Sequence, residues 1–407
     1  MRQSFRASVL LLGLMLLPAC NRGDVAPGAS GGGAPAVRET PYAGEAETAG
    51  ADDAAAAAPG EAPGPEDDKD RVASDAPPAD DPGAVEALQS LSAKLKRDDE
   101  GFVAEVDLRG TTADDGALAH LAGLRRVRSV LVAETGVTDA GLATLGQIDT
   151  LQNLDVRDCR ISNAGLAHLA GLTGLRALRL SGNNGRTTVD DQGLAALAKL
   201  ESLKALALDF VWVSEEGLAQ LGGLENLQEL YLAKTLVGDE ALAELARFPQ
   251  LKKLRISQTQ VTGDGLAHLA KLPALEELDL SECVQVLDDG LAHLAGMTQL
   301  RRLNLWRVPI GDAGVAHLAG LVNLRWLNLD NTQLTDAGLE HLRGMTRLEF
   351  LHLGSTAVSD AGLKHLEALK ALKDLKVTRT AVTAAGVEQL QKRLPDTEIQ
   401  LKYIAGQ

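Results

Sequence analysis

The sequence Leu324–Arg347, LRWLNLDNTQLTDAGLEHLRGMTR, contains the pattern on which the chain is built. Its first leucine opens the run Leu-x-x-Leu-x-Leu, and an aliphatic residue recurs at that position every 24 residues in nine of eleven intervals. One other interval is 25 residues, and the interval from Leu175 to Leu203 is 28. A fixed period of this length predicts a solenoid of stacked coils. The twelve positions are Val103, Val127, Leu151, Leu175, Leu203, Leu227, Leu251, Leu275, Leu300, Leu324, Leu348 and Leu372.

Within one repeat, the spacing of the apolar residues predicts a short strand followed by a short helix. The leucines of Leu-x-x-Leu-x-Leu point inward from the strand. A small polar residue, Thr332 in the quoted repeat, then turns the chain and can bond the loop backbone. Leu339 and Leu342 follow at a spacing of three, as on one face of a helix.

The order of strand, turn, Thr-Asp-x-Gly-Leu and short helix resembles leucine-rich repeat proteins, nearest the ribonuclease-inhibitor-like and F-box-associated class. The resemblance covers residues 102–402. It implies an α/β fold, a right-handed horseshoe-shaped solenoid with parallel strands on the concave face and short helices on the convex face. It also implies the family's usual role, which is to hold another macromolecule on the concave sheet. No segment reads as an F-box, so ubiquitin-ligase roles do not carry over.

Aspartate recurs where the helices are expected to start. A line of carboxylates could suggest metal binding. We favour helix capping, because an acidic side chain at a helix N-terminus accepts unpaired amide hydrogens and meets the positive end of the helix dipole. The positions are Asp115, Asp139, Asp191, Asp239, Asp288, Asp312, Asp336 and Asp360.

The N-terminus has the pattern of an export signal. Two arginines precede the apolar run Val9–Leu17, which is far shorter than the roughly 20 residues of a membrane-spanning helix. The Leu-Pro-Ala-Cys that ends at Cys20 resembles the bacterial lipobox, although proline is a less usual occupant. Asn21 is not the aspartate that retains lipoproteins at the inner membrane. The resemblance therefore implies an outer-membrane lipoprotein, on the periplasmic or the surface face, with ordinary secretion as the alternative.

We expect four parts along the chain. Residues 21–83 hold 14 acidic and 4 basic side chains and are rich in Ala, Gly and Pro, so they cannot bury enough apolar surface to fold. The solenoid needs a cover at each open end. The parts are a signal peptide at 1–19, the lipidated Cys20 and disordered acidic linker at 20–83, an N-terminal capping helix at 84–101, and about 12 repeats with a C-terminal cap strand at 102–407.

Both predicted caps have a sequence signature. Val85, Leu88, Leu91 and Leu95 would lie on one face of the N-terminal helix. At the other end, Ile399 and Leu401 fall in register as a thirteenth strand, with Tyr403 over its edge.

On the concave sheet, the side chains between the inward leucines face solvent, and there the repetition breaks down. Aromatic residues make up only 3% of the chain, yet three lie on neighbouring strands of the last third. Trp326 and Phe350 share one position on adjacent strands, which predicts stacked rings roughly 5 Å apart. Exposed Trp and Arg are favoured binding anchors; packing against a rim loop is the alternative. The candidate binding residues are Tyr231, Arg255, Arg302, Asn304, Trp306, Trp326, Asn328, Asp330, Phe350 and His352.

Two further features have competing interpretations. The insertion Gly182–Val189 and the aromatic residues Phe210 and Trp212 could form a second site at one rim, but we favour the interpretation that these rings cover the longer loop. Cys159 and Cys283 lie five strands apart, about 24 Å, whereas a disulfide needs Cα atoms within about 7 Å. We interpret both as buried free thiols.

Seven of the eight histidines occupy one helical position. An imidazole column could bind metal or respond to pH. No cysteine and no second histidine at i+4 supports a ligand set, so we favour a half-exposed residue copied with the repeat. The column is His120, His168, His268, His293, His317, His341 and His365.

The sequence favours a non-catalytic protein. It contains no His-Glu-x-x-His, Gly-x-Ser-x-Gly, phosphate loop or Cys-x-x-Cys, and we expect no cofactor, no metal and no catalytic residue. The net charge of −16 gives no basic footprint, which argues against a nucleic-acid partner. The sequence therefore predicts a module that is tethered to the bacterial envelope by lipid and binds a protein, a peptide or a glycan. The alternative is an envelope scaffold without a discrete ligand.

Overall fold

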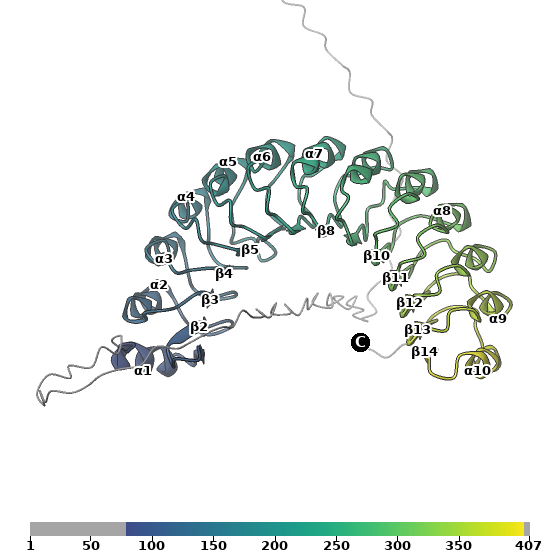
Figure 1. Ribbon diagram of the computed structural model, residues 1–407, viewed down its shortest axis with the longest axis horizontal. Helices are drawn as coiled ribbons and strands as arrows, with labels where there is room; N and C mark the ends of the chain where they lie inside the picture. The colour runs from purple at the N-terminus through teal and green to yellow at the C-terminus, as the bar shows by residue number, and fades with distance from the viewer. Residues whose placement is uncertain (1–78, 403–407) are drawn as a thin grey trace, which may run out of the picture. The chain divides into compact units, whose positions relative to one another are not determined.

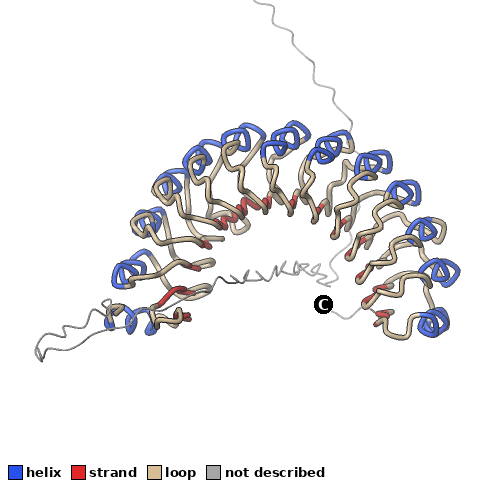
Figure 2. Tube along the Cα trace, viewed as in Figure 1, coloured by secondary structure: helices blue, strands red, loops and turns tan. Residues whose placement is uncertain are grey.

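The computed structural model describes residues 79–402, so the predicted signal peptide, Cys20, most of the linker and Tyr403 lie outside the described residues. Those described residues form an arc, with strands along its inner curve and helices along its outer curve (Figures 1 and 2). The predicted solenoid, with strands on the concave face and helices on the convex face, is confirmed.

One fourteen-stranded sheet follows chain order through the described residues. Its pairs are parallel from β2 onward, and β1 pairs with β2 in the antiparallel sense. The strands are β1 Lys94–Arg97, β2 Val103–Asp107, β3 Ser129–Leu131, β4 Asn153–Asp155, β5 Ala177–Ser181, β6 Ala205–Asp209, β7 Glu229–Tyr231, β8 Lys253–Arg255, β9 Glu277–Asp279, β10 Arg302–Asn304, β11 Trp326–Asn328, β12 Phe350–His352, β13 Asp374–Lys376 and β14 Glu398–Gln400.

The helices are short and several are 3-10 in type, here labelled η. The α-helices are α1 Pro82–Ser90, α2 Asp115–Leu118, α3 Asp139–Leu145, α4 Asn163–Ala167, α5 Asp191–Leu194, α6 Glu215–Gln220, α7 Asp239–Glu244, α8 Asp312–His317, α9 Asp360–Leu363 and α10 Ala384–Arg393. The 3-10 helices are η1 Ala119–Gly123, η2 Ala195–Leu197, η3 Leu245–Arg247, η4 Asp264–Lys271, η5 Asp288–Leu294, η6 Gly338–Leu342 and η7 Lys364–Leu366.

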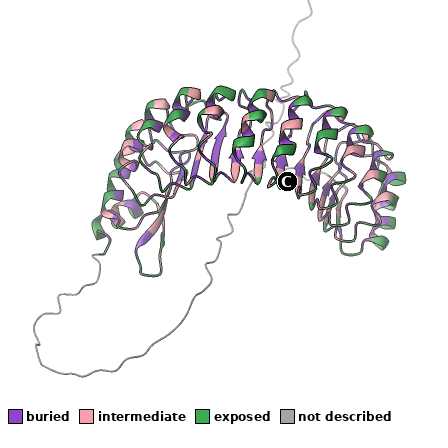
Figure 3. Ribbon diagram, turned by 45° about the horizontal axis from the view of Figure 1, so that its top comes forward, coloured by how far each residue is buried: buried purple, intermediate pink, exposed green. Residues whose placement is uncertain are grey.

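A single apolar core runs between the sheet and the helices, from Leu88 to Leu394 (Figure 3). The twelve repeated aliphatic residues from Val103 to Leu372 are each at most 2% exposed. Cys159 and Cys283 are also buried and unpaired, as predicted. Burial raises the pKa of the Cys283 thiol to about 11.

The turn after each strand uses the predicted polar residue. The Thr332 hydroxyl donates to the Leu329 carbonyl at 2.8 Å, and the residue before it, Asn331, has a left-handed φ of 57°. This left-handed position recurs along the solenoid even though most of its occupants are not glycine. It marks the line along which the chain leaves the concave sheet for the rim.

Most of the recurring aspartates lie in the first turns of their helices, near the positive end of the dipole as predicted, but the prediction that they cap these helices by hydrogen bonds is wrong. The cap is the preceding residue, as where the Thr138 hydroxyl accepts from the backbone of Ala140. Asp115, from the repeat before, accepts the backbone N–H of Thr138 at 2.7 Å and its hydroxyl at 2.6 Å. The same two bonds join Ser162 to Asp139, Ser214 to Asp191, Thr262 to Asp239, Thr335 to Asp312, Ser359 to Asp336 and Thr383 to Asp360. Each carboxylate therefore bridges two coils, which a prediction from one repeat alone could not include.

The same bridge explains the glycine of Asp-x-Gly-Leu. A Cβ atom at Gly265 would overlap the carboxylate of Asp239 in the preceding repeat. Two repeats have alanine at this position. Ala117 belongs to the first repeat, which has no earlier aspartate, and Ala241 follows the repeat in which Glu215 replaces the aspartate. Both alanines thus lie where the bridge is missing, although Gly290 keeps glycine opposite Gly263, which also lacks a carboxylate.

The N-terminal cap differs from the predicted helix over residues 84–101. Helix α1 ends at Ser90, and the chain then forms β1, where Leu95 pairs with Val106. A helix would have left the outer backbone groups of β2 without partners, and an antiparallel strand pairs them. At the other end, Ile399 pairs with Leu375, so the predicted cap strand is confirmed as β14.

We expect Gly265→Ala to lower the free energy of unfolding by about 1–3 kcal/mol, because the added methyl must displace the Asp239 carboxylate. Combining it with Asp239→Ala should cost less than the sum of the two single changes. Urea denaturation of the full chain, followed by circular dichroism, measures both. Gly171→Ala is the control, since a Cβ there meets nothing within 4 Å. Additive losses, or an equal loss in the control, would contradict the bridge.

Candidate functional site

Strands β10 to β13 bring most of the predicted binding residues together. In one row across the sheet, Trp326 pairs with Arg302 on one side and with Phe350 on the other. In the next row Asn304, Asn328, His352 and Lys376 lie on the same four strands. The parallel register therefore sets equivalent side chains of successive repeats side by side on the concave face.

Four of these side chains form a continuous stack, which we call the cation–aromatic stack. The rings of Trp326 and Phe350 are parallel within 5°, with centroids 4.9 Å apart, so the predicted stacking is confirmed. The Arg302 guanidinium lies 3.5 Å from the Trp326 ring centre, and the Lys376 ammonium lies 5.5 Å from that of Phe350. Neighbours on both flanking strands thus cover the faces of Trp326, and the rings are half-buried.

Two asparagines lie beside the stack. In each, the side-chain oxygen is hydrogen-bonded within the protein and the side-chain nitrogen is not. The Asn304 side-chain oxygen accepts from the backbone of Trp306 at 3.2 Å, and the Asn328 oxygen accepts from that of Asp330 at 2.9 Å. Within residues 79–402, their Nδ2 groups have no hydrogen-bond partner. Two amide donors on adjacent strands are therefore available to a ligand.

Three polar side chains crowd around Gly354, the second residue after β12. A Cβ placed there would lie 2.7 Å from Asp330 Oδ1, 2.7 Å from His352 Nε2 and 3.0 Å from Thr378 Oγ1. Glycine fits there because the three polar atoms fill the space that a side chain would need. Burial lowers the pKa of His352, an effect that Asp330 opposes and Lys376 reinforces. The imidazole is accordingly neutral at neutral pH.

The other predicted residues lie on the concave face but outside the stack. Trp306 has the Arg307 guanidinium 5.3 Å from its ring centre. Further back, Arg255 lies 5.1 Å from the Tyr231 ring centre and forms an ion pair with the buried carboxylate of Asp209. Strand β9 separates this second cluster from the stack. The sheet therefore carries two groups of aromatic and charged side chains instead of one continuous patch.

The favoured interpretation of Trp212 as a cover for the insertion is wrong. Its side chain is 65% exposed. Polar bonds hold the insertion instead: Asn184 donates to the Asp158 carbonyl at 2.7 Å, and Thr187 donates to the Ser181 carbonyl at 2.6 Å. Phe210 is half-buried beneath the Lys234 ammonium. The sequence could not show which way the rim loop turns its side chains.

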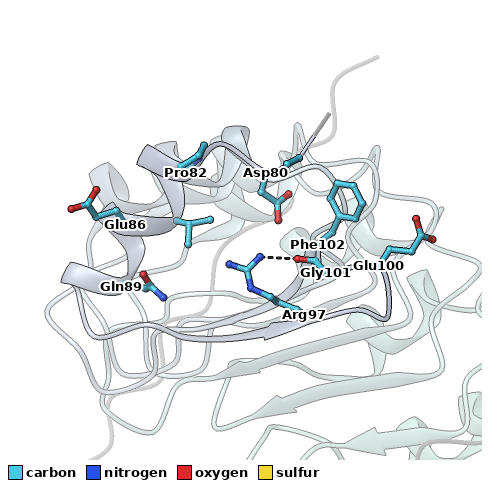
Figure 4. Close-up of a pocket in the computed structure, with 10 residues that line it drawn as sticks. Asp80, Pro82, Glu86, Gln89, Arg97, Glu100, Gly101 and Phe102 are labelled. Carbon is cyan, nitrogen blue, oxygen red and sulfur yellow. Dashed lines mark hydrogen bonds between the residues drawn. The ribbon is translucent and has the colours of Figure 1, made fainter. Parts of the chain in front are cut away.

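An open cavity of about 460 Å³ lies at the N-terminal cap (Figure 4). Two of its charged groups already serve the fold. Asp80 accepts from the backbone of Val103 at 2.7 Å and of Arg125 at 2.9 Å, and Arg97 donates to the Gly101 carbonyl at 2.7 Å. The ten lining residues include no serine, cysteine or histidine. This cavity offers no paired nucleophile and base.

The remaining candidates are surface features. The histidine column is half-buried or exposed on the helices. Within the described part of the chain, no group of three or more His, Cys, Asp or Glu side chains is placed to hold a metal ion. The helices between residues 79 and 402 are all too short or too polar to cross a membrane.

Comparisons with known proteins agree with this geometry. Residues 298–358 and 149–170 match two family models, each described as a leucine rich repeat. An internalin from Listeria monocytogenes has a similar crystal structure, at 19% identity and a TM-score of 0.53, covering 80% of this chain and 95% of that one. The fold is a leucine-rich repeat solenoid.

Two further solved structures are less similar. Internalin C2 from Listeria monocytogenes is 24% identical, with a TM-score of 0.40, over 52% of this chain and 84% of that one. A plant peptide hormone receptor in complex with RGF2 is 12% identical, with a TM-score of 0.41, over 76% and 59%. A comparison with curated proteins gave no match.

The lowered pKa of His352 predicts a pH dependence of stability. The unfolded chain takes up the proton near pH 6.5 while the folded imidazole resists it, so stability falls as pH falls through that range. We expect His352→Gln to lose less stability than the native protein between pH 7 and pH 5, measured by urea midpoints. His293→Gln, at an exposed position of the histidine column, is the control. An unchanged pH dependence in His352→Gln would refute the assignment.

Proposed function

We propose that this protein is a non-catalytic interaction module that holds a polypeptide on its concave sheet at β10–β13. The cation–aromatic stack carries the proposal. A solenoid needs only its inward leucines to fold, so four concave residues that stack across consecutive strands serve something other than the core. Trp and Arg are also the residues that most often dominate binding energy.

The contacts of the stack favour a polypeptide over a glycan. A sugar ring that binds an aromatic residue needs an open face, and both faces of Trp326 are covered by Arg302 and Phe350. What the stack offers is ring edges flanked by two cations. Together with the Nδ2 donors of Asn304 and Asn328, these groups suit the carbonyls and carboxylates of an extended peptide.

Catalysis is not part of the proposal. General acid–base or nucleophilic chemistry needs a reactive group next to a second group that activates it. The side-chain atoms nearest to Gly354 belong to His352, Asp330 and Thr378, and none of these three residues is a serine or cysteine. The finer resemblance to the ribonuclease-inhibitor-like class stays a prediction. The alternative function, an envelope scaffold without a ligand, would leave the stack without a role.

We also propose that Cys20 is lipidated and anchors the solenoid to the bacterial outer membrane. The support is the Leu-Pro-Ala-Cys that follows the apolar run, together with Asn21 after the cysteine. The acidic linker would then act as a flexible tether, with a reach of roughly 45 Å for 63 residues. The sorting to the outer membrane rests on the resemblance to lipoprotein signals alone.

The binding proposal is tested by capture from an envelope extract. Trp326→Ala combined with Trp306→Ala should reduce recovery of the bound polypeptide at least tenfold while leaving circular dichroism unchanged. Arg302→Lys should weaken capture as well, because lysine keeps the charge but loses the planar contact with Trp326. The matched control is Arg301→Lys, whose ion pair with Glu276 is exposed. Undiminished capture by the double variant would favour the scaffold alternative.

The anchor is tested by fractionation. We expect Cys20→Ala to move the protein from the membrane fraction to the soluble fraction, because the acyl chains supply the membrane affinity. Cys159→Ala removes a buried thiol that the proposal does not involve and should stay with the membrane. Membrane association that persists in Cys20→Ala would refute lipidation at this residue.

A further inference from the structure

One rim of the solenoid exposes large apolar side chains that neither the fold nor the concave site uses. In the described part of the chain, five large apolar residues are prominently exposed, and four of them follow the strands on this rim. We call these four the apolar rim: Trp212 at 65%, Leu236 at 43%, Val284 at 65% and Leu287 at 57% exposed. They fall in the loops after β6, β7 and β9.

Backbone hydrogen bonds place these loops on one another. Trp212 donates to the Val189 carbonyl at 3.2 Å, Leu236 to that of Val213 at 2.9 Å, and Gln260 to that of Val237 at 3.1 Å. Trp212 and Leu236 therefore occupy neighbouring rungs of a second ladder. Further along the rim, a parallel bridge pairs Thr262 with Gln285, the residue after Val284. Gln260, which is exposed and polar, occupies the rung between Leu236 and Val284, so the apolar side chains lie along the rim on both sides of it.

The repeat pattern does not require these residues. Val284 lies in the interval of 25 residues, in which the repeat is one residue longer than usual. Leu287 occupies the helix cap, a position that Ser or Thr fills in most repeats, and it makes no side-chain capping bond. Leucine at a cap weakens a helix start. Because Leu287 is exposed and weakens the helix start, we interpret it as a contact for a partner.

The charges at the helix starts that adjoin the apolar rim are all negative, whereas one base, Lys234, is exposed two residues before Leu236 and lies over the Phe210 ring. The first turns of the adjoining helices expose Glu215, Glu216, Glu240, Asp264 and Asp289. The four loops, at residues 211–216, 235–240, 259–264 and 283–289, contain no lysine or arginine. Among the described residues, none of the five exposed acids is in an ion pair. The apolar rim is thus bordered by exposed acids at the helix starts.

We propose that the apolar rim is a docking surface for a polypeptide segment in which apolar side chains alternate with lysine or arginine. Apolar contact and charge complementarity would act together there. The chain's own residues 21–83 are too acidic to serve, with 14 acidic and 4 basic side chains. A two-fold contact between copies would set the acidic borders against each other. Anionic lipid would be repelled as well. This surface is independent of the cation–aromatic stack.

Fluorescence anisotropy of a labelled eight-residue peptide of alternating Leu and Lys tests the proposal on the full chain. Two matched peptides replace Leu by Ser or Lys by Glu. We expect both matched peptides to bind at least tenfold more weakly, because each removes one of the two contributions. Equal binding of the Ser–Lys peptide would show charge attraction alone and overturn the proposal. Equal binding to phosphatidylcholine vesicles would make the rim a lipid contact and overturn it too.

Variants locate the binding. Trp212→Ser with Leu287→Thr should weaken the Leu–Lys peptide at least tenfold, and it should fold well because threonine restores the cap. Neutralising Glu215, Glu216 and Glu240 to Gln should weaken binding and reduce its salt dependence. The control neutralises the exposed acids of the opposite rim: Asp149→Asn, Glu201→Gln and Glu225→Gln. Equal losses in the control, or none in Trp212→Ser with Leu287→Thr, would refute the assignment. Trp326→Ala with Trp306→Ala should bind the peptide normally, which separates this result from the concave proposal.

Discussion

Each coil of this protein is stable because its neighbours cover both of its open sides. The inward leucines of one repeat would be exposed alone, and stacking merges them into one core from Leu88 to Leu394. Hydrogen bonds at three places fix the stacking: the parallel sheet, the rim ladder and the aspartate bridges. The caps at α1–β1 and at β14 close the two ends. Everything outside this core is free to carry other chemistry.

The sequence predicted the fold and the stack for the same physical reason. The repeat fixes the register of parallel strands, so residues one period apart, such as Trp326 and Phe350, must be neighbours. The errors arose where two coils meet or where a loop turns. The role of Asp115 depends on Thr138 of the next coil, and the exposure of Trp212 depends on the path of its loop. The predicted C-terminal end of the capping helix was wrong. Leu91 and Leu95 fit a helical spacing, but the backbone of β2 needed a partner strand.

The two surfaces that we propose for binding differ in design. On the concave face, the stack of Arg302, Trp326, Phe350 and Lys376 is already assembled, so a ligand would meet groups whose positions are set. On the apolar rim, the side chains are largely exposed, so fewer neighbours within the protein hold them in place. One chain can thus present a preorganised face and an adaptable edge, because both are built on the same rigid spine.

The pairing of each aspartate with a glycine in the next coil gives the solenoid a polarity. A joint such as Asp239 with Gly265 needs a carboxylate in one repeat and a glycine in the next, and many repeats carry both residues. Copying a whole repeat within the gene would therefore reproduce a working joint at both of its borders. The joint between Glu215 and Ala241 lacks this match. The solenoid would therefore tolerate duplication of a repeat over most of its length. A segment cut between Glu215 and Ala241 would not form this joint with the other repeats.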